Sequence, residues 1–231
     1  MSEVYCIVEG HAEQAFIRHV LAPYLAERGC FIYAWILGKP GHKGGNVTYE
    51  RFTNDVHRCL RTRNDVYITS MFDYFRLDVN WPGIRELHHN IDSGKALSPF
   101  EILSTLSEYT KTALSQRFPN HSLARKFIPY FSIHEYEALL FSDINIFSKH
   151  FHGGLQQLND ILLAHHNNPE LINTRPEHAP SKRIQRIYPQ YKKIQHGNTI
   201  AQEIGIPTIS NMCRCFNTWV TSLLSLETTN P

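Results

Sequence analysis

Short apolar runs alternate with amphipathic stretches through the first part of the chain. Runs rich in β-branched or aromatic residues lie at 4–8, 30–37, 65–72 and 127–134, and each is typical of a buried strand. Between them, apolar residues at helical spacing predict helices over roughly 13–28, 48–63 and 98–117. This order predicts an α/β fold, with a mostly parallel sheet flanked by helices and joined by right-handed crossovers.

Turn and cap residues fix where several of these elements start and stop. Gly10 allows a sharp turn between the first strand and its helix, and Gly29 is suited to end that helix. Ser98 followed by Pro99 is a favourable start for the long helix that follows. The stretch 74–97 has no clear periodicity, and we interpret it as an irregular loop, or lid, over the strand ends.

The second part of the chain is predicted to be helical. From Asp143 onward the pattern is mostly that of helices, with breaks at glycine, asparagine and proline clusters. We therefore expect a core over 1–143 and a helical elaboration over 144–231 that is basic on one face. The elaboration packs on the core either as a separate unit or as part of one continuous domain.

Composition narrows the class of protein. The chain has 231 residues, 42% of them apolar and 19% charged, as expected for a soluble globular protein. No signal peptide and no long apolar stretch is present, so we expect no membrane association. The five cysteines are odd in number and fit reduced thiols in the cytoplasm better than a disulfide framework.

Basic residues are concentrated in two runs, although the formal net charge is only +2. The runs cover 39–63 and 175–195, and each alone is most often a solvated face. Together with the acids described next, they favour a polyanionic partner such as nucleic acid. The candidate nucleic-acid-binding residues are Lys39, Lys43, Lys182, Arg183, Arg186 and Lys192.

Acidic residues follow three of the four predicted strands. Glu9, Asp73 and Glu135 close these strands, with Glu13 and Glu137 shortly after. Because the carboxyl ends of parallel strands share one edge, these carboxylates should converge and repel one another. A hard divalent cation, Mg²⁺ or Mn²⁺, would offset that repulsion. The alternative is that some of these acids lie in the first turn of a helix, where they interact favourably with the helix dipole. Glu137 is the acid to which this alternative applies most readily.

The segment Val8-Glu9-Gly10-His11-Ala12-Glu13, together with a later strand ending in aspartate, resembles the TOPRIM core. That core is shared by topoisomerases, bacterial primases and OLD-family nucleases, and the Glu-Gly-x-x-Glu form is closest to the OLD group. The chain as a whole is similar to a family of small standalone TOPRIM-like proteins of unknown function, often found beside an ATPase in bacterial anti-phage islands. The matching segments are 8–13, 69–74, 129–130, 134–141, 180–183 and 197–205.

This resemblance implies a Mg²⁺- or Mn²⁺-dependent endonuclease that cleaves DNA or RNA, tRNA included, in anti-phage defence with a partner ATPase. It implies metal ligation by Glu9, Glu13, Asp73, Glu135 and Glu137. Glu9, Glu13 and Asp73 would also be catalytic, and Lys182 and Arg183 would contact phosphate. A homo-oligomer is compatible with this function. A primase- or topoisomerase-like activity is less favoured, because the chain has no evident catalytic tyrosine domain or zinc module.

One position departs from the TOPRIM pattern. The pattern normally carries Asp-x-Asp after its third strand, and here Phe75 stands where the second aspartate is expected. Three alternatives follow. Asp78 replaces the missing ligand, or the site holds one metal rather than two, or catalysis is lost. The last alternative leaves a non-catalytic nucleic-acid-binding or regulatory subunit with a degenerate TOPRIM site.

Overall fold

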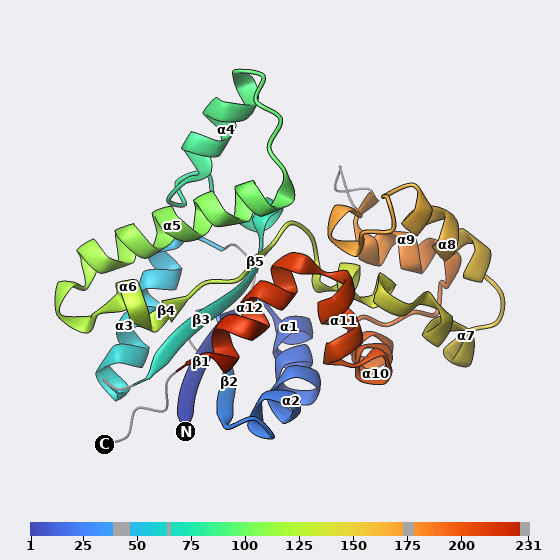
Figure 1. The fold of residues 1–231 in the computed structure, drawn as a ribbon, viewed down its shortest axis with the longest axis horizontal. Helices are drawn as coiled ribbons and strands as arrows, with labels where there is room; N and C mark the ends of the chain where they lie inside the picture. Colours follow the sequence, from blue (N-terminus) through green and yellow to red (C-terminus); the bar gives the residue numbers. More distant parts are fainter. Residues whose placement is uncertain (39–46, 64–65, 173–177, 227–231) are drawn as a thin grey trace.

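The computed structural model describes residues 1–38, 47–63, 66–172 and 178–226 (Figure 1). Its sheet has the strand order β2-β1-β3-β4, with β5 also pairing with β3, and every pairing is parallel. The predicted α/β class with a mostly parallel sheet is therefore confirmed. The strands are β1 (Ser2–Val8), β2 (Cys30–Ile36), β3 (Tyr67–Asp73), β4 (Phe127–Ile128) and β5 (Phe131–Ser132).

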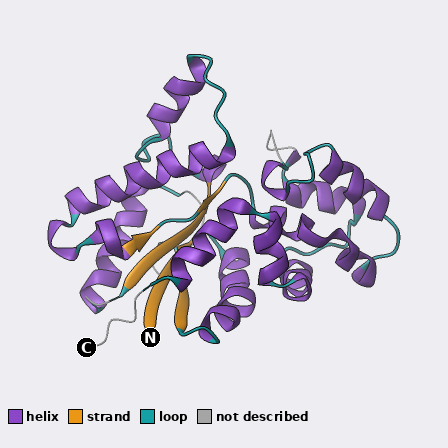
Figure 2. Ribbon diagram, in the orientation of Figure 1, coloured by secondary structure: helices purple, strands orange, loops and turns teal. Residues whose placement is uncertain are grey.

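Helices cover both faces of the sheet and form the rest of the described chain (Figure 2). The first half contains α1 (His11–Phe16), the π-helical η1 (Ile17–Leu21), α2 (Ala22–Ala26), α3 (Tyr49–Thr62), η2 (Tyr74–Arg76), α4 (Ile84–Asp92), α5 (Pro99–Arg117), η3 (Pro119–His121) and α6 (Leu123–Lys126). The second half contains η4 (Tyr136–Ile146), α7 (Phe147–His150), α8 (Leu155–Leu163), η5 (Pro169–Leu171), α9 (Pro180–Ile187), α10 (Gln195–Ile204), α11 (Ile206–Met212) and α12 (Arg214–Leu224).

Strand β1 lies in the middle of two hydrophobic layers. Val4, Cys6 and Val8 belong to one layer, which they share with α1, η1 and the helices α10 to α12. Ile7 belongs to the other, which includes α3, α4 and α5. Successive side chains of a strand point to opposite faces, so a strand covered on both sides must be apolar throughout. That requirement explains the continuous apolar run seen in the sequence.

The expected strand over 127–134 is wrong in its extent. It is two short strands, β4 and β5, separated by Pro129 and Tyr130. Proline has no backbone N–H to donate, so it interrupts the ladder. After β5 the chain enters the 3₁₀ segment η4, which begins at Tyr136. As a result, Glu135 lies beyond the end of β5 rather than on it.

The segment 74–97 is not the irregular loop that was expected, because it contains helix α4. Trp81, just before this helix, is buried, and its indole N–H donates to Thr110 Oγ1 on α5 at 2.9 Å. Ile84 and Leu87 add a short buried stripe. Gly83 precedes the helix at φ +91°, in the left-handed region that favours glycine. Two buried apolar positions are too few to produce a recognisable helical periodicity in the sequence.

The end of the chain returns to the sheet. In Figure 1, α12 crosses one face of the sheet, whereas α7, α8 and α9 lie farther out. Trp219 of α12 donates its indole N–H to Thr69 of β3 at 2.8 Å and stacks on Tyr130 with ring centroids 4.4 Å apart. Residues beyond the expected boundary at 143 thus share the hydrophobic core of the strands.

Two further findings bear on the composition. Among the residues described here, no helix is long and apolar enough to cross a membrane. All five cysteines lie in the described part of the chain and are free thiols. Cys213 is buried beside the start of α12, where its side chain packs in the protein interior.

Glu170 caps α12 from a distance, and this contact yields a stability prediction. Its carboxylate accepts the backbone N–H groups of Cys215 and Phe216 at 3.0 and 2.9 Å, at the N-terminus of the helix. Charge-assisted caps of this kind contribute about 1–2 kcal/mol. We expect Glu170→Ala to lower the free energy of unfolding by about that amount in urea denaturation. Glu86→Ala, at an exposed position on α4, is the control, and equal losses in both variants would contradict the assignment.

Candidate functional site

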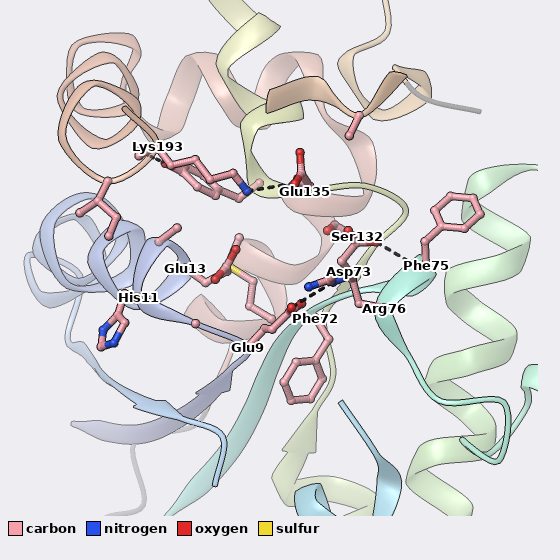
Figure 3. A pocket seen from close by; sticks show the side chains of 16 residues that line it. Glu9, His11, Glu13, Phe72, Asp73, Phe75, Arg76, Ser132, Glu135 and Lys193 are labelled. Atoms are coloured by element: carbon pink, nitrogen blue, oxygen red, sulfur yellow. Dashed lines mark hydrogen bonds and ion pairs between the residues drawn. The ribbon is translucent and has the colours of Figure 1, made fainter. Parts of the chain in front are cut away.

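A cavity of about 550 Å³ opens at the carboxyl edge of the parallel sheet (Figure 3). The residues that line it come from the turn after β1, the end of β3, the segment after β5, and the region around α9 and α10. They are Glu9, Gly10, His11, Ala12, Glu13, Met71, Phe72, Asp73, Phe75, Arg76, Ser132, Glu135, Tyr136, Ala179, Lys193 and Ile194. This edge is where ligands bind in open parallel sheets.

Glu9 follows β1 directly and forms an ion pair across the cavity mouth. Its Oε1 lies 3.1 Å from Arg76 Nε, which comes from η2 after β3. The Glu9 side chain is 16% exposed, whereas that of Arg76 is 63% exposed. The Glu9 charge raises the pKa of Arg76, so the guanidinium stays charged. The pair holds the ends of two neighbouring strands together at the edge.

Glu13 lies one turn into the first helix, as its spacing from Glu9 predicted. Figure 3 shows its carboxylate directed into the cavity, on the opposite side of Asp73 from Phe75. Burial raises the pKa of Glu13, and the charge of Glu9 raises it further, although Lys193 acts in the opposite direction. Glu13 is therefore a carboxylate whose charge is poorly compensated by the protein alone.

Asp73 ends β3 and lies between the other acids. Its Oδ1 accepts the backbone N–H of Phe75 at 2.9 Å, which fixes the carboxylate at the start of η2. Burial raises the pKa of Asp73 to about 7, and the charges of Glu9 and Glu135 add to the effect. A carboxylate with such a pKa lies among like charges in a poorly solvated place.

Lys193 connects two acids at the back of the cavity. Its Nζ lies 3.0 Å from Glu135 Oε1 and 3.1 Å from Glu137 Oε1. Although burial opposes it, the two carboxylates raise the pKa of Lys193 above its ordinary value. Glu137 is 0% exposed, and burial raises its pKa to about 8 despite Lys193. We call these three residues the ion triad.

Neighbouring groups hold the ion triad in place. Glu135 Oε2 accepts the backbone N–H of Ser181, at the start of α9, at 3.1 Å. Burial opposes the ionisation of Glu135, but Lys193 and Ser181 keep its pKa below the ordinary value. Tyr136 donates its hydroxyl to the carbonyl of Lys193 at 2.7 Å. A Cβ at Gly197 would overlap the Tyr136 hydroxyl, so this position needs glycine.

The structure brings together four of the five predicted metal ligands. Glu9, Glu13, Asp73 and Glu135 line the cavity, whereas Glu137 lies behind its wall against Lys193. The cavity-lining cations are Arg76 and Lys193, neither of which was singled out from the sequence. Lys193 lies within the basic run over 175–195, but the run did not distinguish it from the other bases there. For Arg76 the sequence offered no signal.

The basic residues predicted to bind nucleic acid, where the structure describes them, are not among the residues of the cavity wall. Lys182 and Lys192 are exposed, and neither they nor Arg183 nor Arg186 are among the residues lining the cavity. Arg183 Nε donates to the carbonyl of His178 at 2.8 Å, so it contributes to its own turn. Their predicted contacts with phosphate stay predictions. Lys39 and Lys43 lie outside the described residues.

The cavity offers the donor chemistry of a hard divalent cation. Four carboxylates face it, and burial, together with the charges of Glu9 and Glu135, keeps the pKa of Asp73 raised despite Arg76. In the described part of the chain, no three acids, histidines or cysteines are grouped closely enough to enclose an ion. Mg²⁺ commonly takes only one or two protein carboxylates and keeps several waters. A partly hydrated Mg²⁺ or Mn²⁺ therefore fits these residues, with Glu9 and Asp73 as candidate ligands.

A family model described as a domain of unknown function, DUF4276, matches residues 8–224, which is nearly the whole chain. The chain belongs to the DUF4276 family. No significant match was found among curated proteins or among solved structures. The match begins at Val8, so it includes every acid of the cavity and both of its strong bases.

The ion triad of this DUF4276 protein predicts a strong, non-additive effect on stability. Lys193→Met would leave Glu137 buried without a partner, which costs about 3–5 kcal/mol in comparable cases. We expect a loss of that order in urea denaturation at a pH above 8, where Glu137 of the wild type is ionised. Adding Glu137→Leu to Lys193→Met should restore much of it, because the buried charge is then removed. Lys192→Met, next in the chain and exposed, is the matched control. Additive losses in the double variant would contradict the coupling.

The raised pKa of Asp73 predicts a particular pH dependence. The folded-state pKa of about 7 lies above the ordinary 3.8. Between these values the unfolded chain releases this proton first, so the metal-free native state loses stability as pH rises. Asp73→Asn removes that cost, and we expect it to be more stable than wild type at pH 8 by about 1–3 kcal/mol, with little difference at pH 4. Chemical denaturation in a chelator measures this.

Asp78→Asn is the control for that experiment. Asp78 Oδ1 accepts the N–H of Asn80 at 2.8 Å, the same local turn that Asp73 makes with Phe75, but outside the cavity wall. It should not reproduce the gain at high pH. A constant difference between wild type and Asp73→Asn from pH 4 to pH 8 would overturn the assignment.

Proposed function

We propose that this DUF4276 protein is a Mg²⁺- or Mn²⁺-dependent nuclease that cleaves phosphodiester bonds in DNA or RNA. One observation carries the proposal: four carboxylates from separate elements meet in one cavity at the carboxyl edge of the sheet, beside two cations. Carboxylates whose negative charges are not fully compensated by nearby cations favour a divalent metal ion. The cations beside them favour an anionic substrate. Metal-dependent phosphodiester hydrolysis uses both features.

The residues of the cavity have separate roles in the proposed reaction. Glu9 and Asp73 hold the ion, which when bound supplies Lewis-acid stabilisation of the charge on the phosphate. Glu9 accepts a proton from the attacking water, since it is the least exposed partner in its ion pair and comes straight from a rigid strand. Arg76 and Lys193 face the phosphate oxygens. Lys193 is held by two acids, so it contributes a fixed charge rather than a mobile one.

The alternative is a non-catalytic nucleic-acid-binding or regulatory subunit. Phe75 stands where the second aspartate of the TOPRIM pattern is expected, and its ring is 55% exposed at the cavity rim. Asp78 does not line the cavity, so it supplies no replacement ligand in this arrangement. Of the alternatives raised by the sequence, a single-metal catalytic site and a binding module therefore remain.

The wider setting is also a proposal. The resemblance to standalone TOPRIM-like proteins favours a bacterial anti-phage role, with the nuclease as effector and an ATPase as partner. A homo-oligomer is compatible with that role. We infer cytoplasmic action, because the substrate is nucleic acid and the thiols are free.

Manganese binding and cleavage together test this proposal. We expect Mn²⁺ to bind the wild type in calorimetry, and Glu9→Gln with Asp73→Asn to abolish binding. The same double variant should lower Mn²⁺-dependent cleavage of single-stranded DNA and of tRNA by at least about 100-fold, as expected when the groups that stabilise a transition state are removed.

Glu86→Gln, an exposed acid on α4, is the matched control and should retain both properties. Mn²⁺ binding without cleavage, even with the partner ATPase added, would favour the binding module. If the wild type binds no Mn²⁺ in the presence or absence of oligonucleotide, the metal site and the nuclease proposal both fail.

A further inference from the structure

The ring of Phe75 is an exposed aromatic surface at the edge of the carboxylate cavity. It is 55% exposed, whereas the neighbouring Phe72 is 1% exposed and belongs to the core. Figure 3 shows the Phe75 ring on the side of Asp73 away from Glu13 and Lys193, at the rim of the cavity. Single exposed rings are common on protein surfaces, but this one lies in the wall of a charged cavity.

The ring is held in one orientation before any ligand arrives. It lies parallel to the ring of His134, with centroids 5.6 Å apart and planes 9° apart. Tyr74 meets it edge-on, with centroids 5.1 Å apart. The backbone is fixed as well, because Phe75 donates its N–H to the Asp73 carboxylate at 2.9 Å. A ring fixed in this way loses little conformational freedom when a flat ligand stacks on it.

We propose that Phe75 is a stacking platform for an unpaired base next to the phosphate that the site holds. The proposal rests on the nuclease function and adds to it a substrate class: single-stranded nucleic acid. Aromatic side chains beside a cationic groove are the usual means of binding unpaired bases, because every base has a flat face. Arg76, next in the chain and 63% exposed, is the cation of the cavity that would contact the backbone phosphate.

A duplex would meet this surface differently. Paired bases are stacked on each other and cannot offer a free face to Phe75. The ring would then contact only the sugar edge, and its removal would change little. Selectivity for unpaired bases is therefore the property that distinguishes a stacking platform from an incidental exposed ring.

The test compares two labelled strands of about twelve nucleotides, a common site size. One is a thymidine oligonucleotide, and the other is its abasic analogue with the same phosphates. Fluorescence anisotropy is measured in Ca²⁺, which offers the oxygen-ligand chemistry of the site. We expect wild type to prefer the thymidine strand by about tenfold, and Phe75→Leu to bind both strands alike. A uridine strand should behave as the thymidine strand does, since stacking does not read the sugar.

Two variants control for loss of folding and for loss of any exposed ring. Phe75→Trp keeps a stacking surface and should keep the preference, with its fluorescence quenched by the thymidine strand. Phe100→Leu removes another exposed phenylalanine, 39% exposed on α5 and outside the cavity wall, and should behave as wild type. A paired duplex should bind wild type and Phe75→Leu equally.

The outcomes separate the two proposals. If the strands bind but wild type shows no preference, or Phe75→Leu keeps it, the stacking platform is wrong while the metal site and cleavage can stand. If neither strand binds wild type and Mn²⁺ does not bind either, the nuclease function fails and the platform fails with it. Loss of the preference in Phe75→Leu alone, with Mn²⁺ binding retained, is the result that supports the platform.

Discussion

The ion triad of Lys193, Glu135 and Glu137 is the interaction on which the rest of the arrangement depends. Glu137 has no exposed surface, and a carboxylate in such a place is tolerated as an ion only beside an opposite charge. That charge comes from a residue more than fifty positions later in the chain. The C-terminal helices must therefore pack against the carboxyl edge of the sheet before the edge is stable. This long-range requirement joins the two parts of the chain into one core.

The second constraint is the burial of β1 on both faces. Every residue from Val4 to Val8 lies between helices or strands, so polar side chains are excluded until the strand ends. The first acid, Glu9, lies beyond that limit, and Asp73 ends β3 in the same way. Parallel pairing places both ends at one edge. Acids that directly follow these two strands are therefore brought together at this edge.

The sequence predicts what is local and misses what is long-range. Glu9, Asp73 and Glu135 could be placed because an acid after an apolar run indicates a strand end whatever the rest of the chain does. Lys193 could not be separated from the five other bases of its run, because the inward residue depends on how the chain turns after α9. Helix α4 was missed because its buried face has only Ile84 and Leu87. The break at Pro129 is visible in the sequence, but a single proline does not reveal that pairing resumes beyond it.

The two cations of the cavity differ in what they are able to do. Lys193 has two acidic partners and little freedom, so its charge is largely committed to the ion triad. Arg76 forms an ion pair with Glu9, and most of its side chain is exposed. Under the proposed function, a divalent ion held by Glu9 would share the charge of that carboxylate and would weaken its ion pair with Arg76. Arg76 would then be the cation available to a phosphate, whereas Lys193 would hold the acids of the ion triad in place.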